Sequence, residues 1–149
     1  MKIKVLIIDN NLDNCKRIKY NMQDETTDVY YALDSTDGIQ RLVTESWHLV
    51  IMSLLISEMN GTELLRRLRT LKSLPILVLS TPETQSEALE ALRYGADGVM
   101  SNDDSLDMWL AQAQATLRRY LSSTQHTEPS YITVCNGNIM IDTENRRVF

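Results

Sequence analysis

Five short apolar runs alternate with segments of helical periodicity through most of the chain, and this alternation constrains the fold more than any other feature. The central run, Leu49–Leu55, is apolar at every position except Ser53, as expected of a strand that is covered on both faces. Strands that alternate with helices form a parallel sheet with helices on both sides. The sequence therefore predicts an α/β fold with a doubly wound five-stranded parallel sheet. Its strands are expected at Ile3–Ile8, Val29–Leu33, Leu49–Leu55, Pro75–Ser80 and Val99–Met100.

The segments between these runs repeat their apolar side chains at intervals of three and four residues, which is the spacing of one helical face. In the first of them the apolar residues are Leu12, Cys15, Ile18 and Met22. The predicted helices are Leu12–Gln23, Ser35–Trp47, Thr62–Leu71, Glu83–Tyr94 and Asp104–Ser122.

The last part of the chain has a different pattern, which predicts a division into three parts. Residues 1–121 form the α/β domain, and residues 122–130, SSTQHTEPS, are expected to be a linker because they are polar and contain a proline. Residues 131–149 are expected to form a short C-terminal β segment, since Asn136-Gly137 is a strong hairpin signal between two strand-like runs.

Composition excludes several kinds of function. The formal net charge of -5 gives no positive field for nucleic acid. Two cysteines, Cys15 and Cys135, provide neither a disulfide framework nor a zinc ligand set, so both are expected to be free thiols. No run is apolar enough to be a signal peptide or to span a membrane. We expect a cytoplasmic protein without a metal or another cofactor.

Four blocks of the sequence, in this order, resemble the receiver domain of two-component response regulators, which has a flavodoxin-like fold. They are VLIIDNN, LVIMSLLISEMNG, PILVLS and GADGVM, and the resemblance covers Lys2–Leu121. The tail, NGNIMIDTENRRVF, resembles the opening strands of the winged-helix effector of the OmpR/PhoB class. The resemblance implies a bacterial transcriptional regulator that contacts DNA through a complete effector domain, of which residues 131–149 would be the truncated beginning.

This resemblance also implies a phosphorylation site, and the chain departs from it at most of its parts. In the family a histidine kinase phosphorylates an aspartate at the end of the third strand, where this chain has Ser53. An acidic pair after the first strand holds a divalent cation, and here the pair is Asp9 and Asn10. The lysine that pairs with the phosphate is replaced by Asn102.

The family's conformational switch is half retained. Ser80 matches the hydroxyl residue of the switch, whereas Val99 occupies the position of its aromatic residue. We therefore expect a non-enzymatic receiver that aspartyl phosphorylation does not control.

Two alternatives remain open. Ser53 could itself accept phosphate, although a serine hydroxyl needs a general base to become a good nucleophile. The pocket between Asp9, Ser53, Ser80 and Asn102 could instead bind a small molecule.

The resemblance further implies a partner surface made of the fourth helix, the fifth strand and the fifth helix, through which the OmpR/PhoB class forms symmetric dimers. The class pairs charged residues there, whereas this chain has small, apolar or amide side chains. We expect a constitutive homodimer that rests on apolar contact. The expected interface residues are Ala88, Leu89, Leu92, Met108, Ala111, Gln112 and Ala115.

Overall fold

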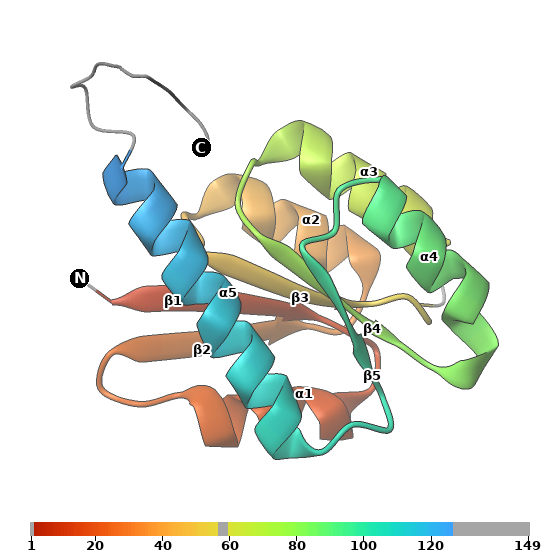
Figure 1. Ribbon diagram of the computed structural model, residues 1–149, viewed down its shortest axis with the longest axis horizontal. Coiled ribbons are helices and arrows are strands. Elements are labelled where there is room, and N and C mark those ends of the chain that lie inside the picture. Colours follow the sequence, from red (N-terminus) through yellow and green to blue (C-terminus); the bar gives the residue numbers. More distant parts are fainter. Residues whose placement is uncertain (1, 57–59, 127–149) are drawn as a thin grey trace, which may run out of the picture. The chain divides into compact units, whose positions relative to one another are not determined.

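The strands and helices of the computed structural model alternate as the sequence predicts (Figure 1). The structure describes residues 2–56 and 60–126, so the predicted C-terminal β segment lies outside the described residues. The strands are β1 (Ile3–Ile8), β2 (Thr27–Ala32), β3 (Leu49–Ser53), β4 (Ile76–Ser80) and β5 (Gly98–Ser101). The helices are α1 (Leu12–Met22), α2 (Ser35–Thr44), α3 (Gly61–Leu71), α4 (Gln85–Arg93) and α5 (Leu106–His126), and a short 3₁₀ helix, Pro82–Thr84, precedes α4.

All five strands are parallel and lie in the order β2-β1-β3-β4-β5. Figure 1 shows α1 and α5 on one face of the sheet and α2, α3 and α4 on the other. The predicted doubly wound fold is therefore confirmed. The first compact unit of the chain ends at Arg118, and the packing described below is within this unit.

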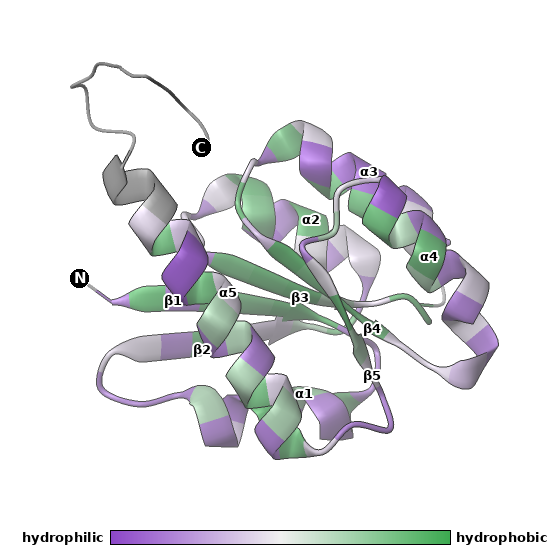
Figure 2. Cartoon of the chain, viewed as in Figure 1, coloured by the Kyte–Doolittle hydropathy of each residue, from purple (hydrophilic) through white to green (hydrophobic). Residues whose placement is uncertain are grey.

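The central strands β1, β3 and β4 are mainly apolar, as their green colour in Figure 2 shows, and their side chains are buried. On the face covered by α1 and α5, alternate strand residues such as Ile7 and Ile51 form one core with Cys15, Ile18 and Trp109. Side chains one position along each strand, such as Leu6 and Met52, point to the opposite face and are fully buried. Burial on both sides explains why the strands read as continuous apolar runs.

Several predicted boundaries differ from the observed ones. β2 starts at Thr27, two residues before the predicted start. β3 ends at Ser53 rather than Leu55. α5 continues to His126 and so includes the first residues of the predicted linker. Polar composition did not prevent a helix there, because helix propensity differs little among such side chains.

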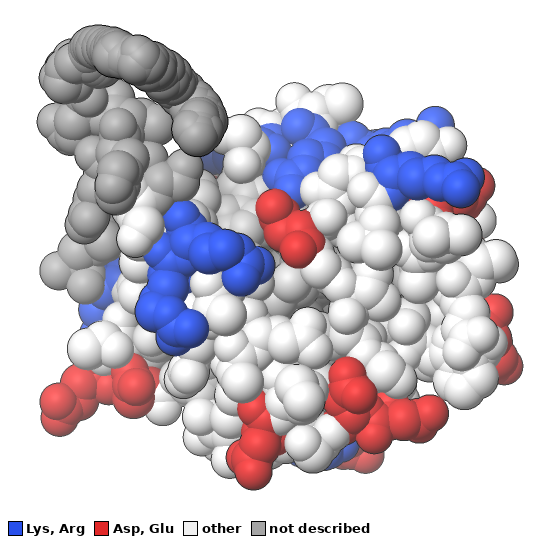
Figure 3. Space-filling model, in the orientation of Figure 1, with Lys and Arg blue, Asp and Glu red and all other residues white. Residues whose placement is uncertain are grey.

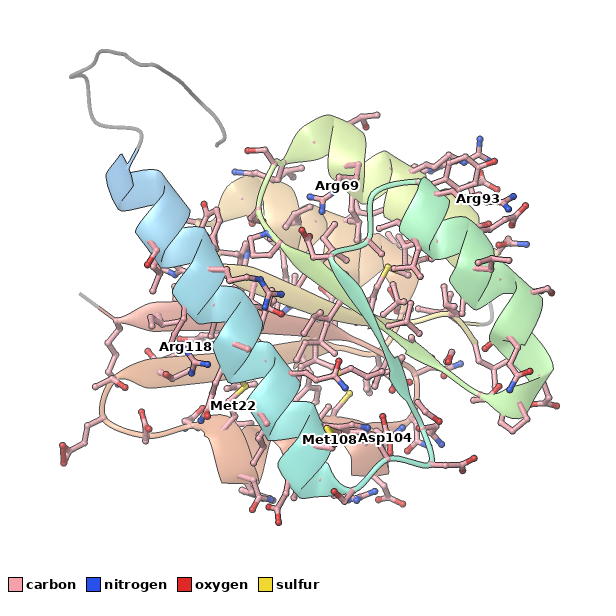
Figure 4. The ribbon with its side chains drawn as sticks, in the orientation of Figure 1. Met22, Arg69, Arg93, Asp104, Met108 and Arg118 are labelled. Carbon is pink, nitrogen blue, oxygen red and sulfur yellow. The ribbon has the colours of Figure 1, made fainter. Side chains whose placement is uncertain are left out.

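Arg69 of α3 joins three segments beside β4 and β5 (Figure 4). Its Nε and Nη2 donate to the carbonyl oxygen of Gly95 at 2.9 and 2.6 Å. Nη1 donates to the Leu74 carbonyl oxygen, and Nη2 also pairs with the carboxylate of Asp97. The same carboxylate accepts the backbone N–H of Ile76 at 2.8 Å. These contacts hold the start of β4 and the turn before β5 in register.

Candidate functional site

The residues that the sequence singles out lie together at the carboxyl edge of the sheet. Asp9 follows β1, Ser53 and Ser80 end the adjacent strands β3 and β4, and Asn102 follows β5. The strand register brings them level, since Ser53 lies beside Leu79 and Ser80 beside Ser101. Asp9, Ser53 and Ser80 are buried, with 2, 7 and 8% of their surface exposed. Asn10 and Asn102 are exposed.

Asp9 is the acidic residue at the centre of this edge. Its Oδ1 accepts the backbone N–H of Asn11 at 2.9 Å, and its Oδ2 accepts the side-chain N–H of Asn14 at 3.4 Å. Burial raises the pKa of the Asp9 carboxyl, and these two hydrogen bonds oppose the increase without cancelling it. The carboxylate is thus already engaged on both oxygens by groups of its own chain.

Asn14 is a site residue that sequence reasoning did not identify. The Nδ2 group that donates to Asp9 also donates to Oδ1 of Asn102 at 3.2 Å. Local structure orients this side chain, because Asn11 caps α1 by accepting the backbone N–H of Asn14 at 3.2 Å. Asn102 is held in turn by its backbone N–H, which donates to the Ser80 carbonyl oxygen at 2.7 Å. A chain of amide hydrogen bonds therefore runs from β1 through α1 to the loop after β5.

Ser53 lies at the position where the family carries the phosphoacceptor. Its Oγ accepts the backbone N–H of Leu55 at 3.1 Å and lies 3.4 Å from the Leu55 carbonyl oxygen, to which it donates. Within the described part of the chain, these contacts place the hydroxyl on the backbone rather than on a carboxylate or imidazole. Among the hydrogen bonds of the described residues, none joins the Ser53 hydroxyl to a group that could act as its general base.

The two switch positions lie in neighbouring strands. Ser80 ends β4 and is buried, and Val99 lies in β5 opposite Val78. The loop after β5 is fixed further by Trp109 of α5, whose Nε1 donates to the Ser101 carbonyl oxygen at 2.8 Å. Trp109 is only 2% exposed and therefore belongs to the buried face of α5.

The donor set of the site does not fit the divalent cation that the family uses. Mg²⁺ prefers charged oxygen ligands because it loses its water reluctantly. Asp9 offers one carboxylate, while Asn10 and Ser53 replace two expected acids with neutral groups. Nowhere among residues 2–56 and 60–126 do three or more His, Cys, Asp or Glu side chains form a group that could hold a metal ion.

The expected interface residues divide into inward and outward groups. Leu89, Leu92 and Met108 are 57, 49 and 50% exposed, and Ala111 is also exposed. Gln112 and Ala115 are half-buried.

Ala88 is a correction to the expected interface, since it packs in the core of its own chain. The apolar residues of α4 cover a wide part of the helix surface, because some pack against the sheet and others face solvent. Ala88 and Ala91 face the sheet, while Leu89 and Leu92 face outward.

Comparison with known proteins identifies the family that this fold and site suggest. The model of the response regulator receiver domain matches residues 5–114, and the chain belongs to this family. The transcriptional regulatory protein YclJ of Bacillus subtilis, itself uncharacterized, is 27% identical over 118 residues, which are 79% of this chain and 52% of YclJ. The response regulator ArlR of Staphylococcus saprophyticus is 25% identical over 116 residues, 78% of this chain and 53% of ArlR. The chain therefore spans about half the length of these curated relatives.

Solved structures agree in fold. A two-component response regulator from Clostridium difficile superposes with a TM-score of 0.74 at 24% identity, covering 79% of this chain and 98% of that one. The response regulator DrrB of Thermotoga maritima, an OmpR/PhoB homolog, gives a TM-score of 0.71 at 19% identity over 80% of this chain and 54% of DrrB. Among the described helices, none is both long and apolar enough to cross a membrane.

Proposed function

We propose that this chain is the receiver domain of a bacterial transcriptional regulator that works through protein contact, without control by aspartyl phosphorylation. One observation carries the proposal: Ser53 replaces the acceptor, and the amides of Asn14 and Asn102 bond to each other where a lysine would meet the phosphate. A neutral amide cannot balance the charge of a phosphoryl group as an ammonium does. The regulator is expected to be cytoplasmic and to contact DNA through an effector domain beyond this receiver.

Incubation with a small phosphoryl donor, followed by intact mass measurement, tests the first part. We expect no added phosphoryl mass on the wild-type chain, with or without Mg²⁺. A phosphoryl adduct that disappears in Ser53→Ala would contradict the proposal and identify Ser53 as a substitute acceptor. A thermal-shift screen of small metabolites tests the remaining alternative, because a stabilising ligand lost in Asn102→Ala would indicate a sensor pocket.

We further propose that the domain forms a constitutive homodimer through α4, β5 and α5. Three large apolar side chains on α4 and α5, Leu89, Leu92 and Met108, are about half exposed. Figure 3 shows white surface over much of this face, with basic atoms over the upper part of α5 and acidic atoms near its lower end. The exposed apolar side chains suit an interface that needs no charge rearrangement to form.

Equilibrium sedimentation at micromolar concentration tests the dimer. We expect a dimer whose affinity does not change on addition of a phosphoryl donor. Leu92→Asp should dissociate it, whereas Val43→Asp on α2 should not, although Val43 is 48% exposed and Leu92 is 49% exposed. A wild-type monomer would exclude constitutive dimerisation.

A further inference from the structure

Helix α3 begins with an asparagine followed by a glycine. Asn60 is the N-cap of the helix and Gly61 is its first residue. An asparagine side chain is open to attack by the backbone nitrogen of the next residue, and glycine hinders this attack least because it has no Cβ atom. Asn60 is exposed to water, whereas Gly61 is buried. The pair is therefore chemically suited to spontaneous deamidation.

The reaction would join the Gly61 nitrogen to Cγ of Asn60. An amide nitrogen becomes a useful nucleophile when a base removes its proton, and here hydroxide from solvent is the base. The new C–N bond closes a five-membered succinimide ring, and the side-chain nitrogen takes up a proton and leaves as ammonia. Water then opens the ring at one of its two carbonyl carbons, which gives aspartate or isoaspartate. The only co-reactant consumed is water.

The cap of α3 holds Asn60 in a geometry that does not react. Its Oδ1 accepts the backbone N–H of Thr62 at 2.8 Å and the Thr62 hydroxyl at 2.6 Å. The backbone of Asn60 is extended, with ψ of 135°. Ring closure instead needs the Gly61 nitrogen to lie level with Cβ of Asn60 about the Cα–C bond, since both atoms belong to the ring. The ring can therefore close only after Asn60 rotates about this bond.

We infer that Asn60 is a site of spontaneous deamidation and that the cap of α3 controls its rate. The two donors of Thr62 polarise the Asn60 carbonyl group, which by itself would favour attack. The rotation that ring closure requires breaks both hydrogen bonds first, so their net effect is protection. Deamidation thus follows the local opening of the first turn of α3. This inference does not depend on the proposed function.

The two products should affect α3 differently. Aspartate at position 60 keeps an acceptor for Thr62 and adds a negative charge at the helix N-terminus, where it is favourable. Isoaspartate adds one methylene group to the backbone immediately before Gly61. Gly61 has no room to move toward Leu54, because even a Cβ atom there would lie 2.6 Å from the Leu54 Cα and carbonyl oxygen. Isoaspartate should therefore displace the start of the helix.

Peptide mapping by mass spectrometry tests the inference on the whole chain, incubated in mildly alkaline buffer. Trypsin cleaves after Arg41 and Arg66, and the peptide between them contains Asn60 as its one asparagine and no glutamine. The mass gained when an amide becomes an acid therefore identifies Asn60 in this peptide. We expect the folded chain to react at least about tenfold more slowly than the chain in guanidinium chloride, because the folded chain must first open locally.

A substitution at Thr62 tests the role of the cap. Thr62→Val removes the hydroxyl donor and keeps the shape of the side chain, and it should speed deamidation of the folded chain about fivefold, as for the loss of one hydrogen bond. Thr62→Ser retains a hydroxyl and should react at the wild-type rate. Thr70→Val is the matched control, because the Thr70 hydroxyl donates to the Arg67 carbonyl oxygen on the exposed side of the same helix.

The outcomes distinguish the site from its control by the cap. No mass gain in guanidinium chloride would show that Asn60 is not a deamidation site. Equal rates in the folded and unfolded wild type, or equal rates in Thr62→Val and Thr70→Val, would overturn the protective role of the cap. If circular dichroism shows that Thr62→Val is unfolded, the comparison of wild type with and without guanidinium chloride decides the question.

Discussion

The side chain of Asn14 donates a hydrogen bond to Oδ1 of Asn102 at 3.2 Å, which joins two residues 88 positions apart. The same amide group donates to Asp9. One side chain of α1 thereby links the end of β1 to the loop after β5, at the place where phosphorylation would act in a typical receiver. Neutral amide side chains therefore join these two segments at the carboxyl edge of the sheet.

Substitution of Asn14 tests how much these contacts contribute. We expect Asn14→Ala to lower the free energy of unfolding by about 1 kcal/mol, because Asp9 and Asn102 each lose a hydrogen bond. Urea denaturation of Asn14→Ala, Asn102→Ala and the double variant should show a coupling of about 0.5–1.5 kcal/mol. Asn21→Ala is the control, since its amide donates to the Arg17 carbonyl oxygen on the exposed side of the same helix. Strict additivity of the two substitutions would show that the contact contributes nothing.

Restoring carboxylates should restore metal binding. The wild-type site offers Asp9 alone, so we expect no change in melting temperature when Mg²⁺ is added. Asn10→Asp combined with Ser53→Asp places three carboxylates at one edge of the sheet, and Mg²⁺ should then stabilise the chain by about 1.4 kcal/mol at ten times its dissociation constant. Each single variant is the control and should respond less than the double variant. An equal response of wild type would show that one carboxylate is sufficient.

The sequence was sufficient to predict the sheet and the place of the site. Five apolar runs separated by helical periodicity determine a parallel sheet, and the residues that end its strands must then meet at one edge. Ser53 stands out in this way at the end of the central run, whereas the roles of Asp9 and Ser80 come from the resemblance to the receiver family. All three side chains are buried.

Other features depend on contacts that periodicity does not report. The Asn14 side chain matters because its α1 cap directs it toward Asn102, and no local pattern reveals a partner in a loop so distant in sequence. Ala88 and Leu89 are neighbours with similar apolar character, yet packing against the sheet buries the first and leaves the second exposed. Trp109 could have been predicted to face inward, because it lies four residues before Ala113 on the same side of α5, and both are buried.

A methyl group at Gly61 should destabilise the fold although alanine is the better helix former. A Cβ atom there would lie 2.6 Å from both Cα and the carbonyl oxygen of Leu54, which are backbone atoms that cannot turn aside. We expect Gly61→Ala to cost about 1–3 kcal/mol, outweighing the gain in helix propensity. Gly98→Ala is the control, because its Cβ would meet only the end of the Leu77 side chain, at 3.0 Å. Urea denaturation should give a clearly smaller loss for this variant.

Stability should fall in mild acid because of His48. Its Nδ1 accepts the backbone N–H of Lys4 at 3.0 Å, so the ring must be neutral there. Burial, and secondarily the charge of Lys4, lower the pKa of His48 below 6.5. The unfolded chain therefore binds a proton more readily than the folded chain. The contribution of neutral His48 to the free energy of unfolding is present above pH 6.5 and is lost as the pH falls below it.

The variant His48→Asn tests this, because it keeps a hydrogen-bond acceptor that does not titrate. Its unfolding free energy should drop less than that of wild type between about pH 7.5 and about pH 5.5, while the raised pKa of Asp9 affects both chains equally. Parallel pH profiles for the two chains would exclude His48 as the cause.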